Sequence, residues 1–190
     1  MEADRNLYIK NMVCDRCKAA VTQVLRNAGL TPLSVELGTA SVEENPDVAK
    51  LDEVRIALEE QGFELLEDRR KQTVDRIKSA IIELVHYRDN RQQVNLSAFL
   101  SNELGMEYSS LSKLFSENTG LTIERYFILQ RVERIKELIF YGEMSLSEIA
   151  RKMNYSSVAY LSTQFKSVTG MTPSQFKSAH DKQLRQLDKI

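Results

Sequence analysis

The 190-residue chain contains few of the residues that build several common kinds of functional site. It has two cysteines, Cys14 and Cys17, two histidines and no tryptophan. Two cysteines cannot form a disulfide framework, so a small disulfide-stabilised protein is excluded. The sequence shows no nucleophile or acid–base constellation around its two isolated histidines, and we therefore expect no enzyme activity.

Long apolar segments are also missing. No run approaches the roughly 20 residues that a membrane-spanning helix needs, and residues 1–10 lack the hydrophobic core of a signal peptide. The apolar content of 42% and the charged content of 28% are typical of a globular protein. We therefore expect a cytoplasmic protein with no membrane partner.

The net charge of −1 conceals an uneven distribution along the chain. Residues 1–70 contain nine Lys or Arg and fourteen Asp or Glu, which gives −5. Residues 71–190 contain seventeen Lys or Arg and thirteen Asp or Glu, which gives +4. Only the second part therefore has a charge suited to phosphates, and we expect two domains with different roles.

The hydrophobic pattern of residues 1–68 predicts the element order β-α-β-β-α-β, a ferredoxin-like α+β sandwich. Strands are expected at 6–10, 33–37, 40–43 and 63–66, and a first helix at 15–28. A second helix is expected to begin at Asn45-Pro46 and to end at Gly62, with a buried side formed by Val48, Leu51, Val54 and Leu58.

The motif Cys14-Asp15-Arg16-Cys17 lies where the first strand meets the first helix. A helix N-terminus lowers the pKa of a thiol, so we expect one or both sulfurs to be thiolates near neutral pH. Two thiolates suit Cu(I), with Zn(II) as an alternative, whereas a closed structural zinc site needs four ligands. A thioredoxin-like redox pair is disfavoured, because the order of elements differs and no tryptophan precedes Cys14.

These residues resemble a heavy-metal-associated (HMA) domain. The HMA loop Gly-Met-x-Cys-x-x-Cys corresponds to residues 11–17, with Asn11 in place of the glycine. The resemblance implies that Cys14 and Cys17 bind the metal, and that Met12 and Phe63 pack around the site. It also implies a metal-trafficking protein as a partner.

The rest of the chain is predicted to be helical after a linker at residues 69–72. The pattern indicates an amphipathic helix at 73–88 with His86 near its end, at the surface or at an interface, and a polar linker at 90–94. Residues 181–190 form a polar tail to which we assign no function.

A twelve-residue motif then occurs twice. Leu111-Ser112-x-x-Phe115-x-x-x-Thr119-Gly120-x-Thr122 recurs fifty residues later, beginning at Leu161. Each copy follows a short apolar helix and a tight turn, which predicts two helix-turn-helix units at about 96–120 and 145–170. Ser156 or Ser157 is expected to cap the last helix of the second unit.

A connecting helix is predicted at 122–141, between the two units. About 20 helical residues span about 30 Å, close to the ~34 Å between successive major grooves on one side of DNA. A plain helical bundle would explain the apolar positions, but it would not explain the small, hydroxyl-bearing outward faces or the positive charge.

Residues 73–180 resemble the DNA-binding domain of AraC/XylS transcription regulators. The signature comprises Ile149-Ala150, Tyr155, Leu161-Ser162, Phe165-Lys166, Thr169-Gly170-Met171-Thr172-Pro173-Ser174 and Phe176-Lys177. Asn154 replaces the usual turn glycine and tolerates a left-handed conformation better than most residues.

The resemblance implies which residues meet DNA. Lys113 is the one expected to pair with guanine, and Arg131 and Lys166 are expected to contact phosphates. The residues expected to face the bases are Ser109, Ser110, Ser112, Lys113, Ser157, Val158, Ala159, Ser162 and Thr163.

We therefore expect a sequence-specific transcription regulator that binds promoter DNA, works with RNA polymerase and responds to Cu(I) bound at the CxxC motif. Metal would change how the acidic module packs on the basic one. Two alternatives remain: a metal-independent AraC-type regulator whose N-terminal domain docks a partner, and a metal chaperone.

Overall fold

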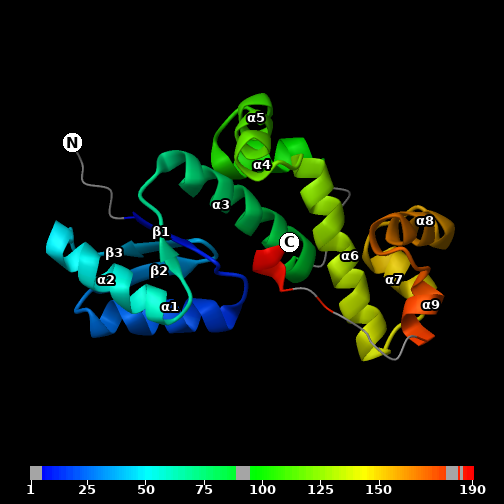
Figure 1. The fold of residues 1–190 in the computed structure, drawn as a ribbon, viewed down its shortest axis with the longest axis horizontal. Helices are drawn as coiled ribbons and strands as arrows, with labels where there is room; N and C mark the ends of the chain where they lie inside the picture. Colours follow the sequence, from blue (N-terminus) through cyan, green and yellow to red (C-terminus); the bar gives the residue numbers. More distant parts are fainter. Residues whose placement is uncertain (1–5, 89–94, 179–183, 185) are drawn as a thin grey trace. The chain divides into compact units, whose positions relative to one another are not determined.

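The computed structural model describes residues 6–88, 95–178, 184 and 186–190. The chain forms two compact units, residues 1–80 (unit 1) and 81–190 (unit 2), which are described separately (Figure 1). The predicted linker at 90–94 and part of the predicted tail lie outside the described residues. Within the described ranges, no helix combines the length and the apolar character needed to cross a membrane.

Unit 1 has the predicted element order, with a four-stranded antiparallel sheet in the order β2-β3-β1-β4. Figure 1 shows α1 and α2 on one side of this sheet. The core between them is built from residues such as Ile9, Leu25 and Leu58, which are completely buried. The elements are β1 (Asn6–Lys10), α1 (Asp15–Asn27), β2 (Pro32–Glu36), β3 (Thr39–Val42), α2 (Val48–Glu60) and β4 (Glu64–Leu65).

The start of α2 differs from the prediction. Asp47 caps the helix by accepting a hydrogen bond from the Lys50 amide at 2.8 Å, so Pro46 lies outside it. Val48 is then the first helical residue and is 76% exposed rather than buried. The prediction for Val48 was wrong because the apolar spacing alone does not fix where the first turn begins.

Residues 69–72 are helical rather than an extended linker, since α3 (Arg69–Ile82) begins at Arg69. The carboxylate of Asp68 accepts a hydrogen bond from the Arg70 amide at 2.7 Å and so holds the beginning of the helix. Farther along, α3 packs closely on the β2–β3 turn. A Cβ atom on Gly38 would lie 2.6 Å from Ser79 Oγ, and Gly38 has a left-handed φ of +81°. Glycine is therefore required at this turn.

The same turn covers Asp75. Its Oδ2 would lie 3.2 Å from a Cβ on Gly38, and burial raises the pKa of this carboxyl from 3.8 to about 7. Lys78 and Lys10 lower the pKa, and Glu64 raises it, but burial has the largest effect.

Asp75→Asn should make unit 1 more stable at pH 8. The raised pKa means that the protonated carboxyl favours the folded state, and that this contribution is lost as the pH rises through about 7. We expect the free energy of unfolding of the variant to exceed that of the wild type by about 2 kcal/mol at pH 8, and to depend less on pH. Urea unfolding of the whole chain at pH 5 and pH 8, followed by circular dichroism, measures this. Equal pH dependence in the two proteins would contradict the burial of Asp75.

Unit 2 is helical, and its longest helix, α6, is the axis against which the others pack (Figure 1). The end of α3 continues into a π-helical turn, η1. The elements of this unit are η1 (Glu83–Tyr87), α4 (Leu96–Leu104), α5 (Tyr108–Thr119), α6 (Ile123–Tyr141), α7 (Leu146–Lys152), α8 (Val158–Thr169), α9 (Pro173–Ser178) and the 3₁₀ turn η2 (Leu187–Lys189).

His86 is buried at an interface within unit 2, one of the two positions that the sequence predicted, rather than at the surface. Its Nε2 lies 3.1 Å from Gln130 Oε1, and its Nδ1 lies 3.7 Å from the Glu137 carboxylate. Gln130 in turn donates to the Tyr126 hydroxyl at 2.9 Å. A π-helical turn contains about one more residue than an α-helical turn, so α-helical spacing does not predict the face that His86 occupies.

Candidate functional site

Unit 2 contains two helix-turn-helix units of similar construction. In α5, Leu111 and Phe115 are completely buried, and in α8 the equivalent residues Leu161 and Phe165 are as well. Both helices end at a glycine in the left-handed conformation, with φ near +72° in the first unit and +79° in the second. The repeated motif therefore marks two structurally equivalent helices.

The second unit is fixed at both of its helix starts. Ser145 and Glu148 form a capping box at the beginning of α7. Asn154 occupies the turn with a left-handed φ of 52°, as its place in the motif predicts. Ser157 accepts a hydrogen bond from the Tyr160 amide at 3.1 Å and caps α8. Ser157, rather than Ser156, is therefore the cap.

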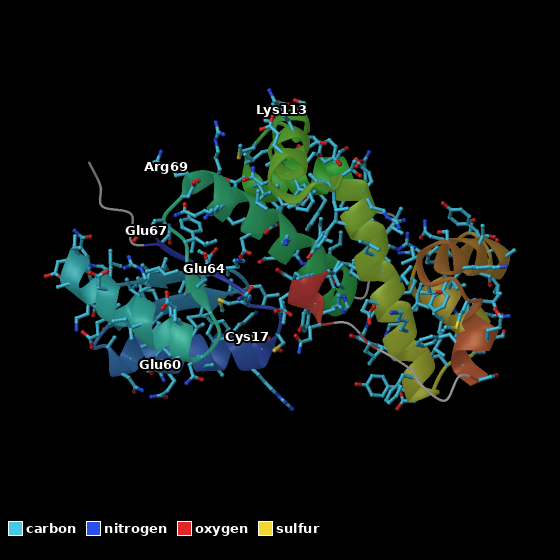
Figure 2. All side chains as sticks on the ribbon, in the orientation of Figure 1. Cys17, Glu60, Glu64, Glu67, Arg69 and Lys113 are labelled. Atoms are coloured by element: carbon cyan, nitrogen blue, oxygen red, sulfur yellow. The ribbon has the colours of Figure 1, made fainter. Side chains whose placement is uncertain are left out.

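The outward face of α5 carries most of the predicted base-facing residues of the first unit. Ser109, Ser110 and Lys113 are exposed, and Ser112 is half-buried. The Lys113 side chain is 78% exposed and lies 3.9 Å from Glu117, a weak ion pair in solvent. Figure 2 shows Lys113 projecting from the outer side of α5. Its ammonium group is accessible to a ligand.

The outward face of α8 is smaller and less polar. Ala159 and Thr163 are exposed, and Val158 and Ser162 are half-buried. The Thr163 hydroxyl donates to the Ala159 carbonyl at 3.0 Å, which leaves its oxygen free to accept a second bond. These groups suit contacts to methyl groups and single hydrogen bonds.

Tyr160 is an exposed residue of α8 that the sequence interpretation missed. It is 54% exposed, and its ring lies 5.8 Å from that of Tyr155. It precedes Thr163 by three residues, so helical spacing already placed the two side by side. An aromatic ring here adds an apolar surface to the face of α8.

The two residues predicted to contact phosphates have different environments. Lys166 is exposed near the end of α8. Arg131 is half-buried, lies on α6 and donates a hydrogen bond to the carbonyl of Met153. The phosphate contact of each stays a prediction, but Arg131 has other partners within the domain.

Lys113→Ala should weaken binding to the preferred DNA site by about 1–3 kcal/mol and relax specificity at one base pair, because an exposed ammonium can pair with guanine O6 and N7. Titrations against the preferred site and single-base variants measure this. Lys166→Ala is the matched control. If Lys166 contacts a phosphate, its loss should weaken binding to all DNA sequences alike and reduce the salt dependence of binding. The same uniform behaviour for Lys113→Ala would contradict base readout.

The two cysteines converge in unit 1. Cys14 occupies the N-cap position of α1, and Cys17, labelled in Figure 2, lies in its first turn. Their Sγ atoms are 3.4 Å apart. Asn11 adopts a left-handed φ of 72° and donates from Nδ2 to the Gly62 carbonyl at 3.0 Å. Met12 is almost completely buried beneath this loop. The loop is thus held in place by the residues directly before the CxxC motif.

Burial raises the pKa of the Cys17 thiol. Backbone hydrogen bonds lower the pKa of Cys17, as expected near a helix N-terminus, but burial has the larger effect. This burial arises from the folded loop, which the sequence alone does not show. A metal ion would have to displace a proton from Cys17. Among the described residues, no cluster of three or more His, Cys, Asp or Glu residues could hold a metal ion.

Comparison with known proteins links unit 2 to DNA-binding domains. A family described as "Helix-turn-helix domain" matches residues 100–179. The xylose operon regulatory protein of Escherichia coli is 26% identical over 103 residues, covering 53% of this chain and 26% of that protein. An uncharacterised HTH-type transcriptional regulator of Staphylococcus aureus is 32% identical over 78 residues, covering 41% of this chain and 10% of the relative. The similarity thus spans about a quarter or less of these relatives.

Two solved structures resemble the same region. The C-terminal domain of AraT, a response regulator from Geobacillus stearothermophilus, is 23% identical, with a TM-score of 0.49 over 58% of this chain and 87% of that one. The DNA-binding domain of AdpA, solved with a target DNA, is 21% identical, with a TM-score of 0.45 over 53% of this chain and 92% of that one. The family match, the repeated motif and the paired helices agree that residues 100–179 form a helix-turn-helix domain.

Proposed function

We propose that the whole chain is a sequence-specific, DNA-binding transcription regulator of the cytoplasm, acting on promoter DNA together with RNA polymerase. The observation that carries this proposal is the pair of equivalent, capped helices α5 and α8, each with an outward face of small or hydroxyl-bearing residues. A helix that presents such a face can enter a major groove without steric conflict.

The connecting helix sets the spacing of the two units. α6 has 19 residues, which correspond to about 28 Å along its axis. Phe115 of α5 packs on Tyr126 near the beginning of α6, with ring centroids 5.5 Å apart. Arg131 binds the turn of the second unit farther along the same helix. This arrangement supports binding of α5 and α8 to successive grooves, about 34 Å apart.

The two helices have different means of reading DNA. Lys113 on α5 can make a bidentate contact with guanine. On α8, Val158 and Ala159 can contact thymine methyl groups, and the Thr163 hydroxyl oxygen can accept one hydrogen bond. We infer that α5 provides the sharper base discrimination and that α8 adds methyl and backbone contacts.

Selection from random DNA sequences tests the proposal. We expect the whole chain to enrich one asymmetric site of roughly 20 base pairs and to bind it at least about a thousandfold more tightly than a scrambled site at the same salt concentration. A chain that enriches no sequence, or that binds both DNAs equally, would not be a sequence-specific regulator.

We further propose that unit 1 binds a thiophilic ion, with Cu(I) preferred over Zn(II), through Cys14 and Cys17. Two sulfur atoms 3.4 Å apart can both reach one ion, since metal–sulfur bonds are about 2.3 Å long. The element order and the strand order of the sheet support the ferredoxin-like assignment. Two thiols leave the site open to exchange with a metal-trafficking protein.

Metal regulation has its own test. DNA affinity is measured at fixed salt with and without one equivalent of Cu(I), for the wild type and for the Cys14→Ser/Cys17→Ser variant. A change of at least about fivefold in the wild type alone supports coupling between the two ligands. Equal affinities with and without metal would support the metal-independent regulator instead.

A further inference from the structure

Arg131 lies at the junction between α6 and the second helix-turn-helix unit. Its guanidinium Cζ is 4.0 Å from the centroid of the Tyr155 ring and 5.5 Å from that of Phe127. One terminal nitrogen donates a hydrogen bond to the carbonyl of Met153, the C-cap residue of α7. The Arg131 side chain thus contacts the α7–α8 turn twice, at the ring of Tyr155 and at the backbone of Met153.

The same turn is connected to α8. The Tyr155 hydroxyl donates to Gln164 Oε1 at 2.5 Å, and Gln164 lies in the middle of α8. Tyr155 is also buried, so its ring cannot move without disturbing its neighbours. A continuous series of contacts therefore runs from α6 through Arg131 and Tyr155 to Gln164.

The environment of Arg131 differs from that of an exposed side chain that is available to bind a phosphate. Burial lowers the pKa of its guanidinium, and its Nε is buried without a hydrogen-bond partner among the described residues. Tyr155 and Tyr160 act in the opposite direction and support the charge. The planar guanidinium combines stacking on a ring with donation to a carbonyl, which a lysine ammonium does not reproduce.

We propose that Arg131 is a positioning residue that fixes the α7–α8 turn on α6 and thereby sets the angle at which α8 meets DNA. This inference rests on the proposed DNA binding. It replaces the phosphate contact that the sequence predicted for Arg131, because the side chain acts through the turn and α8.

Arg131→Lys and Arg131→Gln separate the two roles. If Arg131 is a positioning residue, both variants should lose about tenfold in affinity for the selected site. They should retain wild-type affinity for scrambled DNA and a wild-type salt dependence. If Arg131 contacts a phosphate, lysine should largely substitute for arginine. Glutamine should then weaken binding to both the selected and the scrambled DNA and reduce the salt slope by about 0.9. That second result would overturn the proposal. Arg125→Lys, at an exposed position on the same helix, is the matched control and should be neutral.

Two substitutions at Tyr155 test the contact from the other side. Tyr155→Phe keeps the ring beneath Arg131 but removes the hydroxyl bond to Gln164, and should weaken binding to the selected site less than Arg131→Lys does. Tyr155→Leu removes the ring and should reproduce the loss seen in Arg131→Lys. In the double variant Arg131→Lys/Tyr155→Leu, the two losses should not add. Full additivity would show that the residues act independently.

Hydrogen exchange without DNA distinguishes failure of this inference from failure of the proposed function. In Arg131→Lys, amides of residues 153–165 should exchange faster, while those of α5 should be unchanged. Unchanged exchange at 153–165 would overturn the positioning role whatever the protein binds. Faster exchange in a protein that selects no DNA sequence would leave the positioning contact in place and refute the DNA-binding proposal.

Discussion

Phe165→Ala should lower the free energy of unfolding of unit 2 by about 3–5 kcal/mol. The side chain is completely buried in α8, and its ring lies 5.6 Å from that of Phe176 on α9. A globular domain is stabilised by only about 5–15 kcal/mol in total. We therefore expect the second helix-turn-helix unit to be strongly destabilised at 37 °C and binding to the selected DNA site to need a higher protein concentration. Urea unfolding followed by circular dichroism measures the change.

Two further variants make the result specific to the repeated core. Phe115 occupies the equivalent position in α5, so Phe115→Ala should cost a similar amount. Phe140 is 51% exposed, and Phe140→Ala should cost less than about 1 kcal/mol. If Phe165→Ala behaved like Phe140→Ala, α8 would not be packed as the structure shows.

Cys14→Ser/Cys17→Ser should reduce Cu(I) affinity by at least about a thousandfold. Thiolate sulfur is the ligand that Cu(I) prefers, and a serine hydroxyl is a poor substitute for it. The two Sγ atoms supply the only pair of thiols in the sequence. Competition against a coloured Cu(I) chelator measures the affinity of the whole chain.

The matched control keeps both thiols and changes the residues between them. Asp15 and Arg16 are exposed, so Asp15→Asn/Arg16→Gln should bind Cu(I) within about threefold of the wild type. Wild-type affinity in the double serine variant would exclude the CxxC motif as the metal site, and unit 1 would then be better explained as a partner-docking module.

The sequence predicts best those features that depend on neighbouring residues. The spacing of Leu111, Phe115, Leu161 and Phe165 follows the helical period, so the repeat predicts the helices α5 and α8 correctly. The left-handed conformation of Asn154 also follows from its own backbone preference. Such features need no knowledge of distant contacts.

Other features depend on residues that are far apart in the sequence. His86 is buried because it meets Gln130, 44 residues later. Arg131 has its partners in the turn at residues 153–155, 22 or more residues away. The raised pKa of Asp75 likewise arises from packing against the turn at Gly38. No local pattern contains these contacts, so the sequence alone could not predict them.

Hydroxyl-radical footprinting on the selected DNA tests most directly whether α5 and α8 of one chain read two successive major grooves. At protein concentrations where the chain is monomeric, we expect two protected tracts on one face of the duplex, with centres about 10 base pairs apart. Phe165→Ala should remove one tract and leave the other at higher protein concentration. A single protected tract for the wild type, or two tracts that appear only when two chains are bound, would contradict tandem recognition.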